Sequence, residues 1–360
     1  MSENKTQDTT IGLNQLGWDE FFEGEFSPLR DQGLIPGRIV RETHHLYDVH
    51  TASGRHPAQI SGLFHYRAAV RADYPTIGDW VAMFESGGTF VIEKVLARKS
   101  AFSRKTAGRE IDEQIIAANI DILFIVNALD GGRNFNLRGI ERYIAMAAEG
   151  GARPVIVLNK SDLCPDREQA LAGAVICGDV PVHLVSALTG EGLDELIEDC
   201  GAATVALTGP SGVGKSALIN ALLGEERIRT GAQRQTDLRG RHTTTHKELF
   251  FLRGGLMLID TPGLRELGLW ADKDDIDSAF TDISELAMGC RFKDCSHQGE
   301  PGCAVQKALA EGRIDRGRYE NYLTMKGEIS FLNSKADVRS RLERKVKEKR
   351  LSKIIKQFYI

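Results

Sequence analysis

Long hydrophobic runs, a secretory signal and a large net charge are all missing from this sequence. The longest apolar run lies near Ile122–Val126, far below the ~20 residues needed to cross a bilayer, and the N-terminal residues lack a signal's basic-then-apolar order. Lys and Arg number 46 against 50 Asp and Glu, a net charge of −4. We therefore expect a cytoplasmic protein with no membrane partner, whose affinity for nucleic acid would come from local charge.

Cysteine is also scarce, with six residues in 360, and the chain is long enough to bury substantial cores without disulfides. Its 42% hydrophobic and 27% charged residues are typical of a globular protein, here of several domains. The sequence patterns predict a multidomain α/β protein with five parts. They are an acidic N-terminal extension over 1–35, a barrel over 36–108, a doubly wound domain over 109–275, a cysteine-rich helical module over 276–338 and a basic helix over 339–360.

The first two parts are predicted from local patterns alone. The acidic extension contains Trp18, Phe21 and Phe22, and we expect a mobile arm or a short helix that docks elsewhere. Short alternating runs separated by glycine-containing turns then predict five strands of a small antiparallel barrel, as in an oligonucleotide/oligosaccharide-binding (OB) fold. The basic stretch from Arg98 to Arg109 is expected to be a linker, either contacting phosphates or simply solvated.

Five apolar runs without alternation then predict parallel strands covered on both faces, with helices between them. The runs are Ile122–Val126, Val155–Leu158, Val182–Val185, Val205–Leu207 and Leu256–Ile259. Ligands bind such doubly wound sheets at the carboxyl ends of the strands. The polar motifs that follow these runs are therefore the candidate functional residues.

The strongest motif is a phosphate-binding loop between a strand and a helix. G-x-x-x-x-G-K-S is formed by Gly209, Pro210, Ser211, Gly212, Val213, Gly214, Lys215 and Ser216, and Ala217 continues into the helix. Backbone N–H groups of such a loop surround phosphate oxygens, Lys215 reaches the terminal phosphates, and Ser216 offers its hydroxyl to Mg²⁺. A purely structural glycine turn is the weaker alternative.

Two further segments complete a phosphate site. Asp260-Thr-Pro-Gly263 follows the Leu256–Ile259 run, so that Asp260 can hold Mg²⁺ through water and the Gly263 N–H can sense a γ-phosphate. The polar loop Gly240–Thr245 lies between the two motifs and can offer a second hydroxyl to Mg²⁺. Each string alone could be an ordinary turn, and their positions make them candidate switches.

The base-reading residues are predicted at two other strand ends. They are Asn159, Lys160, Ser161 and Asp162 after one run, and Ser186 and Ala187 after another. The Asp162 carboxylate can accept from both N1–H and the exocyclic amine of guanine, whereas adenine would leave it unpaired. Lys160 would cover the ring with its aliphatic stem, Asn159 would brace a neighbouring loop, and the Ala187 segment would aim an N–H at O6.

The order of these motifs is unusual, because the base-reading elements precede the phosphate loop instead of following it. This order predicts a circularly permuted P-loop GTPase domain. Permutation can leave a parallel sheet unchanged when the original termini lie close together at the surface. The segment after Gly263 then leads directly into the C-terminal module.

That module contains four potential ligands of one tetrahedral metal ion. They are Cys290, Cys295, His297 and Cys303, in the pattern C-x4-C-x-H-x5-C. A set of four protein ligands is typical of structural Zn²⁺, since no position is left for a catalytic water. Free buried cysteines are the weaker alternative.

The basic C-terminal segment has Val338, Leu342 and Val346 at helical spacing among Lys and Arg. Such a helix could bind RNA phosphates, bind an acidic protein surface or be solvated. Nothing in the sequence suggests an obligate interface between subunits, so we expect a monomer.

Taken together, the permuted motifs, the upstream barrel and the cysteine-rich module resemble the RsgA (YjeQ) family of bacterial GTPases that depend on the small ribosomal subunit. The likeness covers about residues 36–335, and further family-like strings are Ser103-Arg104-Lys105, Ile115–Asn119, Gly240–Thr245 and Asp260–Glu266. The resemblance implies a late maturation factor that binds ribosomal RNA and the small subunit and carries one structural zinc ion. It also implies that the protein hydrolyses Mg²⁺-bound GTP and is thereby released from the subunit.

The resemblance also bears on catalysis. Leu264 occupies the position where many GTPases have a water-orienting Gln, so intrinsic hydrolysis should be slow. In the family a switch-loop histidine takes that role, which implies His242 here, with His246 the less favoured substitute and Thr244 reaching Mg²⁺. Two other classes of function are compatible with parts of the sequence. One is a non-catalytic GTP-binding RNA scaffold or assembly chaperone, and the other is an ATPase or small-molecule kinase. Lys215 and Asp260 argue against the first, and Asp162 argues against the second.

Overall fold

The structure is a computed structural model. It describes residues 11–43, 46–106, 112–131, 135–175, 179–228, 247–261, 264, 276–277 and 279–330. The chain divides into two compact units, Met1–Leu269 and Trp270–Ile360, which are described separately. Among the helices of the described ranges, none has the length and apolar character needed to cross a membrane.

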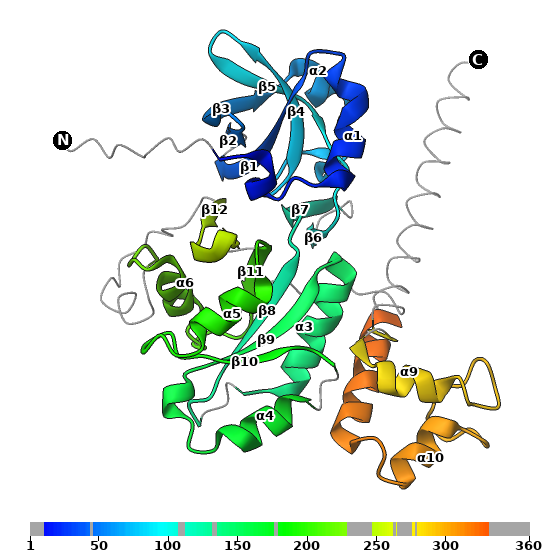
Figure 1. Cartoon of the computed structure of the whole chain (residues 1–360). Coiled ribbons are helices and arrows are strands. Elements are labelled where there is room, and N and C mark those ends of the chain that lie inside the picture. The colour runs from blue at the N-terminus through cyan, green and yellow to red at the C-terminus, as the bar shows by residue number, and fades with distance from the viewer. Residues whose placement is uncertain are drawn as a thin grey trace, which may run out of the picture. The chain divides into compact units, whose positions relative to one another are not determined.

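The first unit begins with a closed barrel of five strands (Figure 1). The strands are β1 (Ile35–Thr43), β2 (Leu46–Thr51), β3 (Gly54–Ile60), β4 (Trp80–Ser86) and β5 (Thr89–Val95), with helix α2 (Gly62–Arg67) between β3 and β4. They are paired in the order β1-β2-β3-β5-β4, and β4 returns to β1 to close the ring. Ile39, Val49 and Ile92 belong to its buried core. The predicted barrel is confirmed, with one parallel pair between β3 and β5.

The acidic extension contains a docked helix, one of the two outcomes expected for it. Asp19 is the N-cap residue of helix α1 (Glu20–Arg30), and its carboxylate accepts hydrogen bonds from N–H groups in the first turn of the helix. Trp18, Phe22 and Phe26 pack around Trp80 of the barrel and are all buried, while Phe21 remains 41% exposed. The aromatic residues of the extension therefore cover one face of the barrel.

The basic stretch is not simply the linker that the sequence suggested. Strand β6 (Ala101–Thr106) pairs with β7 (Asp112–Ala118) in an antiparallel hairpin. The Phe102 side chain is buried, and its ring fills the space where a side chain at Gly150 would lie. This anchoring of one strand, together with the apolar run in β7, explains why a charged segment forms a strand.

The α/β part is a parallel sheet in the order β10-β9-β8-β11-β13, confirming the predicted doubly wound fold. Its strands are β8 (Ile122–Ala128), β9 (Arg153–Asn159), β10 (Val182–Leu184), β11 (Thr204–Thr208) and β13 (Met257–Asp260). Its helices are α3 (Leu137–Gly150), α4 (Arg167–Val175), α5 (Leu193–Cys200) and α6 (Lys215–Leu223). Helices α5 and α6 pack on one face of the sheet in a continuous apolar core, and α3 covers β8 and β9 on the opposite side (Figure 1).

One further strand connects the sheet to the barrel. Strand β12 (Lys247–Phe251) runs antiparallel to β13 on one side and antiparallel to β1 of the barrel on the other. The barrel strands and the parallel strands thus form one hydrogen-bonded sheet of eleven strands. Because β12 has no distinctive sequence motif, this connection is visible only in the structure.

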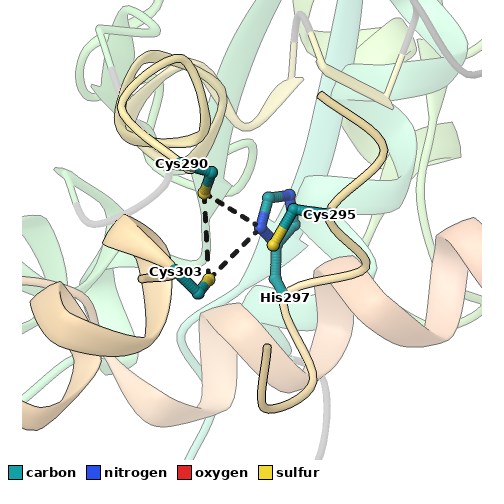
Figure 2. A group of neighbouring side chains, drawn as sticks. All are labelled: Cys290, Cys295, His297 and Cys303. Atoms are coloured by element: carbon teal, nitrogen blue, oxygen red, sulfur yellow. Dashed lines mark hydrogen bonds between the residues drawn. The ribbon is translucent and has the colours of Figure 1, made fainter. Parts of the chain in front are cut away.

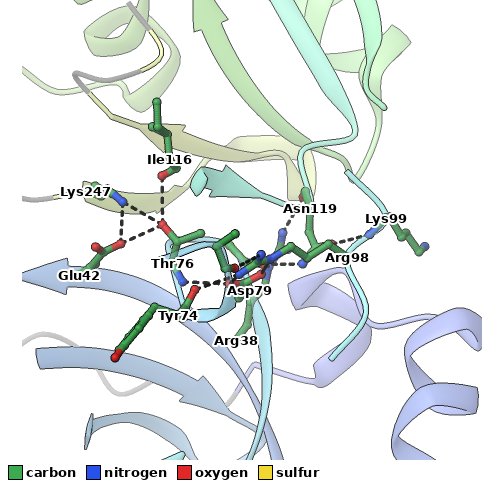
Figure 3. A network of polar contacts seen from close by, with 12 residues as sticks. Arg38, Glu42, Tyr74, Thr76, Asp79, Arg98, Lys99, Ile116, Asn119 and Lys247 are labelled. Atoms are coloured by element: carbon green, nitrogen blue, oxygen red, sulfur yellow. Dashed lines mark hydrogen bonds and ion pairs between the residues drawn. The ribbon is translucent and has the colours of Figure 1, made fainter. Parts of the chain in front are cut away.

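A buried arginine reinforces the same junction. The Arg38 guanidinium donates to the carbonyls of Leu16, Gly78 and Asn119 and, at 2.9 Å, to Thr204 Oγ1 (Figure 3 shows its surroundings). Its side chain is 1% exposed, and burial lowers the pKa of Arg38 to about 10, so the group is still charged at neutral pH. Arg38 therefore joins the extension, the barrel, the hairpin end and β11.

The second unit is small and helical. It contains α9 (Thr281–Ala287), α10 (Ala304–Ala310) and a helical segment over residues 316–330. Arg318 pairs with Asp282 at 2.7 Å and lies over the Phe280 ring, which links the last segment to α9. The predicted basic helix over 339–360 lies outside the described residues.

Replacing Arg38 with Met should destabilise the first unit by about 3 kcal/mol, because buried carbonyl groups lose their charged donor while the volume is nearly kept. The measurement is urea unfolding of the full-length chain, and the free energy is taken from the transition in which the first unit unfolds. Arg30→Met is the matched control: Arg30 pairs with Glu23 at 2.5 Å, but both side chains are about half exposed (59% and 49%). The control should shift stability by less than about 1 kcal/mol, and equal effects of both substitutions would contradict the role of Arg38.

Candidate functional site

The phosphate-binding loop lies between β11 and α6, as its sequence predicted. Gly209, Gly212 and Gly214 have φ values of 129°, 87° and 93°, which side chains rarely adopt. A Cβ atom on Gly209 would lie 2.1 Å from the Val126 carbonyl oxygen, and one on Gly214 would lie 2.4 Å from Asn159 Nδ2. These two glycines are therefore required by the close approach of the loop to β8 and β9.

Lys215 is the first residue of α6 and points back over the loop. Its side chain is buried, and Nζ donates to the carbonyls of Gly209 and Pro210, both at 2.6 Å. Ser216 and Ala217 follow in the first turn of the helix. The free N–H groups of this turn, together with the Lys215 ammonium, make the loop a positively polarised cup suited to an anion.

Asn159 holds two of the predicted elements together. Its Nδ2 donates to the Val213 carbonyl at 2.9 Å, and its Oδ1 accepts from the Ala187 N–H at 3.0 Å. The phosphate loop and the loop after β10 are thereby fixed to the end of β9 by one buried side chain. The bracing expected of Asn159 is present in the structure.

Lys160 and Asp162 lie on either side of Ser161, and both are held by neighbouring loops. Lys160 Nζ donates to Asp130 Oδ2 at 2.7 Å and to the Gly212 carbonyl at 3.0 Å. The Asp162 carboxylate is exposed and accepts from Ser186 Oγ at 2.6 Å. Asp162 is thus oriented by a hydroxyl and open to a ligand.

Two acidic residues of this region were missed by sequence reasoning. Asp130 is the partner of Lys160, and Glu191 accepts from Ser161 Oγ at 3.1 Å and pairs with Arg167 at 2.6 Å. Asp130 lies four residues after the predicted strand Ile122–Val126 and precedes a glycine pair, which is a usable signal. Glu191 has no comparable signal, since only the folded turn brings it to Ser161.

The predicted magnesium ligands Asp260 and Ser216 lie on neighbouring elements. Asp260 ends β13, which is hydrogen-bonded to β11, and Ser216 is the second residue of α6, which follows β11 after the phosphate loop. A carboxylate and a hydroxyl are the donor types that Mg²⁺ prefers. Thr261 beside them is buried, and its hydroxyl has no hydrogen-bond partner among the described residues. Leu264 is buried, whereas Gly263, His242, Thr244 and His246 lie outside the described residues.

The four predicted metal ligands of the second unit converge (Figure 2). Cys290, Cys295, His297 and Cys303 have ligand atoms that all lie within 4.8 Å of one another. The Cys290 and Cys303 sulfurs are 3.8 Å apart, and each lies 3.6 Å from His297 Nδ1. Metal–sulfur bonds of 2.3 Å in a tetrahedron place sulfurs about 3.8 Å apart. The cluster can therefore hold a metal ion.

The backbone around His297 is fixed by side chains of the same unit. His297 has a φ of 63°, and its carbonyl accepts from Gln306 Nε2 at 2.5 Å and from the Tyr319 hydroxyl at 2.6 Å. Cys303 caps α10, with its sulfur accepting from the Gln306 N–H at 3.4 Å. Such outer contacts orient the ligand-bearing backbone before any ion binds.

A family model and a named relative both match this chain to the same family of GTPases. Residues 95–270 match the model of the RsgA GTPase family. The chain is 44% identical over 346 residues to a protein of Opitutus terrae named small ribosomal subunit biogenesis GTPase RsgA, covering 92% of this chain and 94% of that protein.

Solved structures agree in fold. YjeQ from Thermotoga maritima matches with a TM-score of 0.64 and 28% identity, over 82% of this chain and 98% of that one. YloQ, described as a circularly permuted GTPase, matches with a TM-score of 0.63 at 22% identity, over 82% of this chain and 95% of that one. The likeness to YloQ supports the permuted fold alone.

Proposed function

The chain belongs to the RsgA family of GTPases, and from this membership and the site geometry we propose that it hydrolyses GTP in the biogenesis of the small ribosomal subunit, in the cytoplasm. The observation that carries the proposal is the pair of hydrogen bonds made by Asn159, which hold the phosphate loop and the loop at Ala187 together at the end of β9. A triphosphate and its base can be bound together only where these loops converge.

Guanine is the base that Asp162 favours. Its carboxylate accepts the N1–H and exocyclic amine, and the Ser186 hydroxyl, 2.6 Å from Oδ1, holds it in position. Lys160, Ser161 and Ala187 complete the base contacts, with Lys160 held at 2.7 Å from Asp130. An adenine in the same place would leave the Asp162 carboxylate unpaired.

The phosphates are bound by the cup formed by Gly209, Pro210, Ser211, Gly212, Val213, Gly214, Lys215, Ser216 and Ala217. Lys215 would exchange its loop carbonyls for the terminal phosphates, and Gly263 would donate its N–H to the γ-phosphate. Ser216, Thr244 and Asp260 would hold Mg²⁺, which when bound neutralises charge that develops on the phosphates. The Leu264 side chain cannot form a hydrogen bond with the attacking water. We therefore assign the orientation of this water to His242, the residue that the family resemblance implies.

RNA is bound by the barrel, the GTPase domain and the zinc module in this proposal. The division is an acidic extension (1–35), an RNA-binding barrel (36–108), the GTPase domain (109–275), a zinc module (276–338) and a basic helix (339–360) that contacts phosphates. The family's role on the small subunit supports ribosomal RNA as the nucleic acid. The protein acts as a monomer, and hydrolysis releases it from the subunit.

Zinc is the ion proposed for the Cys290, Cys295, His297 and Cys303 cluster. Three thiolates and one imidazole suit Zn²⁺, and the sulfur separation of 3.8 Å matches its tetrahedral geometry. The four ligands come from separate segments of the unit, and Cys303 lies at the start of α10. Zinc binding would therefore contribute directly to its folding.

Loss of zinc should unfold the second unit. The purified chain should contain one zinc ion, and Cys303→Ser should lose it together with helical signal in circular dichroism, because the remaining ligands cannot close the tetrahedron. Cys200→Ala is the matched control: this half-buried cysteine lies on α5 of the first unit and is not one of the four proposed ligands. A zinc content unchanged in Cys303→Ser, measured by atomic absorption, would rule out the assignment.

The proposed function is tested by GTP turnover with purified small subunits, large subunits or neither. Small subunits should raise turnover by about 10²-fold or more, since the intrinsic site lacks a water-orienting Gln, and excess ATP should not compete because Asp162 rejects adenine. Equal turnover in all three mixtures, or effective competition by ATP, would contradict the proposal.

His242→Ala should reduce subunit-stimulated turnover by about 10²-fold, because the attacking water loses its hydrogen-bond partner, while affinity for a GTP analogue stays near that of the wild type. His246→Ala is the control and should retain stimulated turnover. Lys215→Ala should abolish turnover at saturating GTP, which fixes the assay background. The assignment of His242 fails if its variant is stimulated as strongly as the wild type.

A further inference from the structure

Lys247, the first residue of β12, joins two residues of the barrel and its neighbouring segment (Figure 3). Its Nζ lies 2.8 Å from Glu42 Oε2 and 2.8 Å from Thr76 Oγ1, and Thr76 Oγ1 in turn lies 2.9 Å from Glu42 Oε2. We call Glu42, Thr76 and Lys247 the Lys247 cluster. Its members come from β1, from the segment before β4, and from β12.

The cluster is more shielded than an ordinary surface ion pair. The Lys247 and Glu42 side chains are only 18% and 21% exposed, and Thr76 is fully buried. Thr76 Oγ1 also lies 3.1 Å from the carbonyl of Ile116 in β7. Partly buried pairs are screened less by salt and solvent than exposed ones, so the cluster fixes the three segments against one another.

The strand register connects this cluster to the proposed magnesium site. On β1 and β12, Glu42 lies opposite Lys247 and Arg41 lies opposite Glu248. On β12 and β13, Glu248 lies opposite Asp260. A single strand therefore separates the barrel from Asp260, and the cluster holds the start of that strand.

We infer that Glu42, Thr76 and Lys247 are positioning residues through which the barrel controls GTP hydrolysis. When the barrel binds RNA, the position of β1 sets that of β12, and β12 sets the position of Asp260 at the end of β13. The inference rests on the proposed function, and it adds the route by which subunit binding reaches the GTPase site. None of the three residues contacts the nucleotide in this scheme.

A cavity provides access to the cluster from the barrel surface. It has a volume of about 560 Å³, and its lining includes Glu42 and Thr76 together with Tyr47, Arg71 and Tyr74. An arginine beside tyrosine rings suits a phosphate and base of single-stranded RNA. A group bound there can contact Glu42 or Thr76 directly and so change their bonds to Lys247.

Coupling of this kind must act in both directions. If RNA on the barrel changes the affinity of the GTPase site for a nucleotide, then that nucleotide changes the affinity of the barrel for RNA by the same factor. Coupling factors of this type are typically about 5–150-fold. If the ion pair were purely structural, its removal would change thermal stability but would change neither the stimulation of GTP turnover nor the effect of the nucleotide on RNA affinity.

The experiment compares the full-length wild type with Lys247→Met and Glu42→Gln. For each protein, GTP turnover is measured with and without small subunits, and subunit affinity is measured with GDP and with a nonhydrolysable GTP analogue. We expect the ratio of stimulated to unstimulated turnover to fall in both variants. The ratio of the subunit affinity measured with the GTP analogue to that measured with GDP should move towards one by at least about fivefold in the same variants.

Two further variants make the test specific. Asp48→Asn changes a carboxylate of β2 that pairs with Arg55 at 2.5 Å and does not belong to the Lys247 cluster, and it should keep both ratios. The exchange of Glu42→Lys with Lys247→Glu should restore them in part, because the ion pair is rebuilt in reverse. The exchange also covers the case in which a single substitution prevents folding.

The possible results separate the two proposals. If the wild type is not stimulated by small subunits, the proposed function fails. If the wild type is stimulated, and Lys247→Met and Glu42→Gln are stimulated equally with unchanged affinity ratios, the positioning role alone is overturned. An equal loss in Asp48→Asn would also overturn it, because the effect would then follow from the loss of any barrel ion pair.

Discussion

The buried Arg38 guanidinium is the contact on which the arrangement of the first unit depends. A charge with 1% exposure is tolerated only where several acceptors surround it, and here they come from Leu16, Gly78, Asn119 and Thr204. These acceptors belong to four different segments, so all four must be in place for the charge to be satisfied. The junction therefore tolerates little independent movement of the barrel.

This constraint holds the barrel next to the GTPase domain. In the eleven-stranded sheet, β12 is hydrogen-bonded both to the barrel and to the strand that ends at Asp260. One hydrogen-bonded strand thus separates the barrel from Asp260, which we propose as a magnesium ligand. Asn159 performs a similar task at the other side of the site, where one amide joins two loops.

The second unit is stabilised in a different way. The four ligand atoms of its cysteine and histidine cluster lie within 4.8 Å of one another. Gln306 and Tyr319 fix the carbonyl of His297, so the ligands are oriented by the helices, and a bound ion would in turn hold those helices together. A module built in this way can present a surface without needing a large hydrophobic interior.

The sequence by itself determined the features that short strings encode. The loop ending in Lys215 and Ser216, the Asn159–Asp162 motif, the four-ligand spacing and the buried parallel strands are local patterns, because each needs particular residue types at fixed separations. Only the tertiary structure decided the β6–β7 hairpin, the pairing of β12 with the barrel, and the partners of Arg38 and Lys247. Arg38 and Thr204 are 166 residues apart, and Lys247 and Glu42 are 205 apart. Such contacts depend on strand register and burial in the folded chain, and no local pattern specifies them.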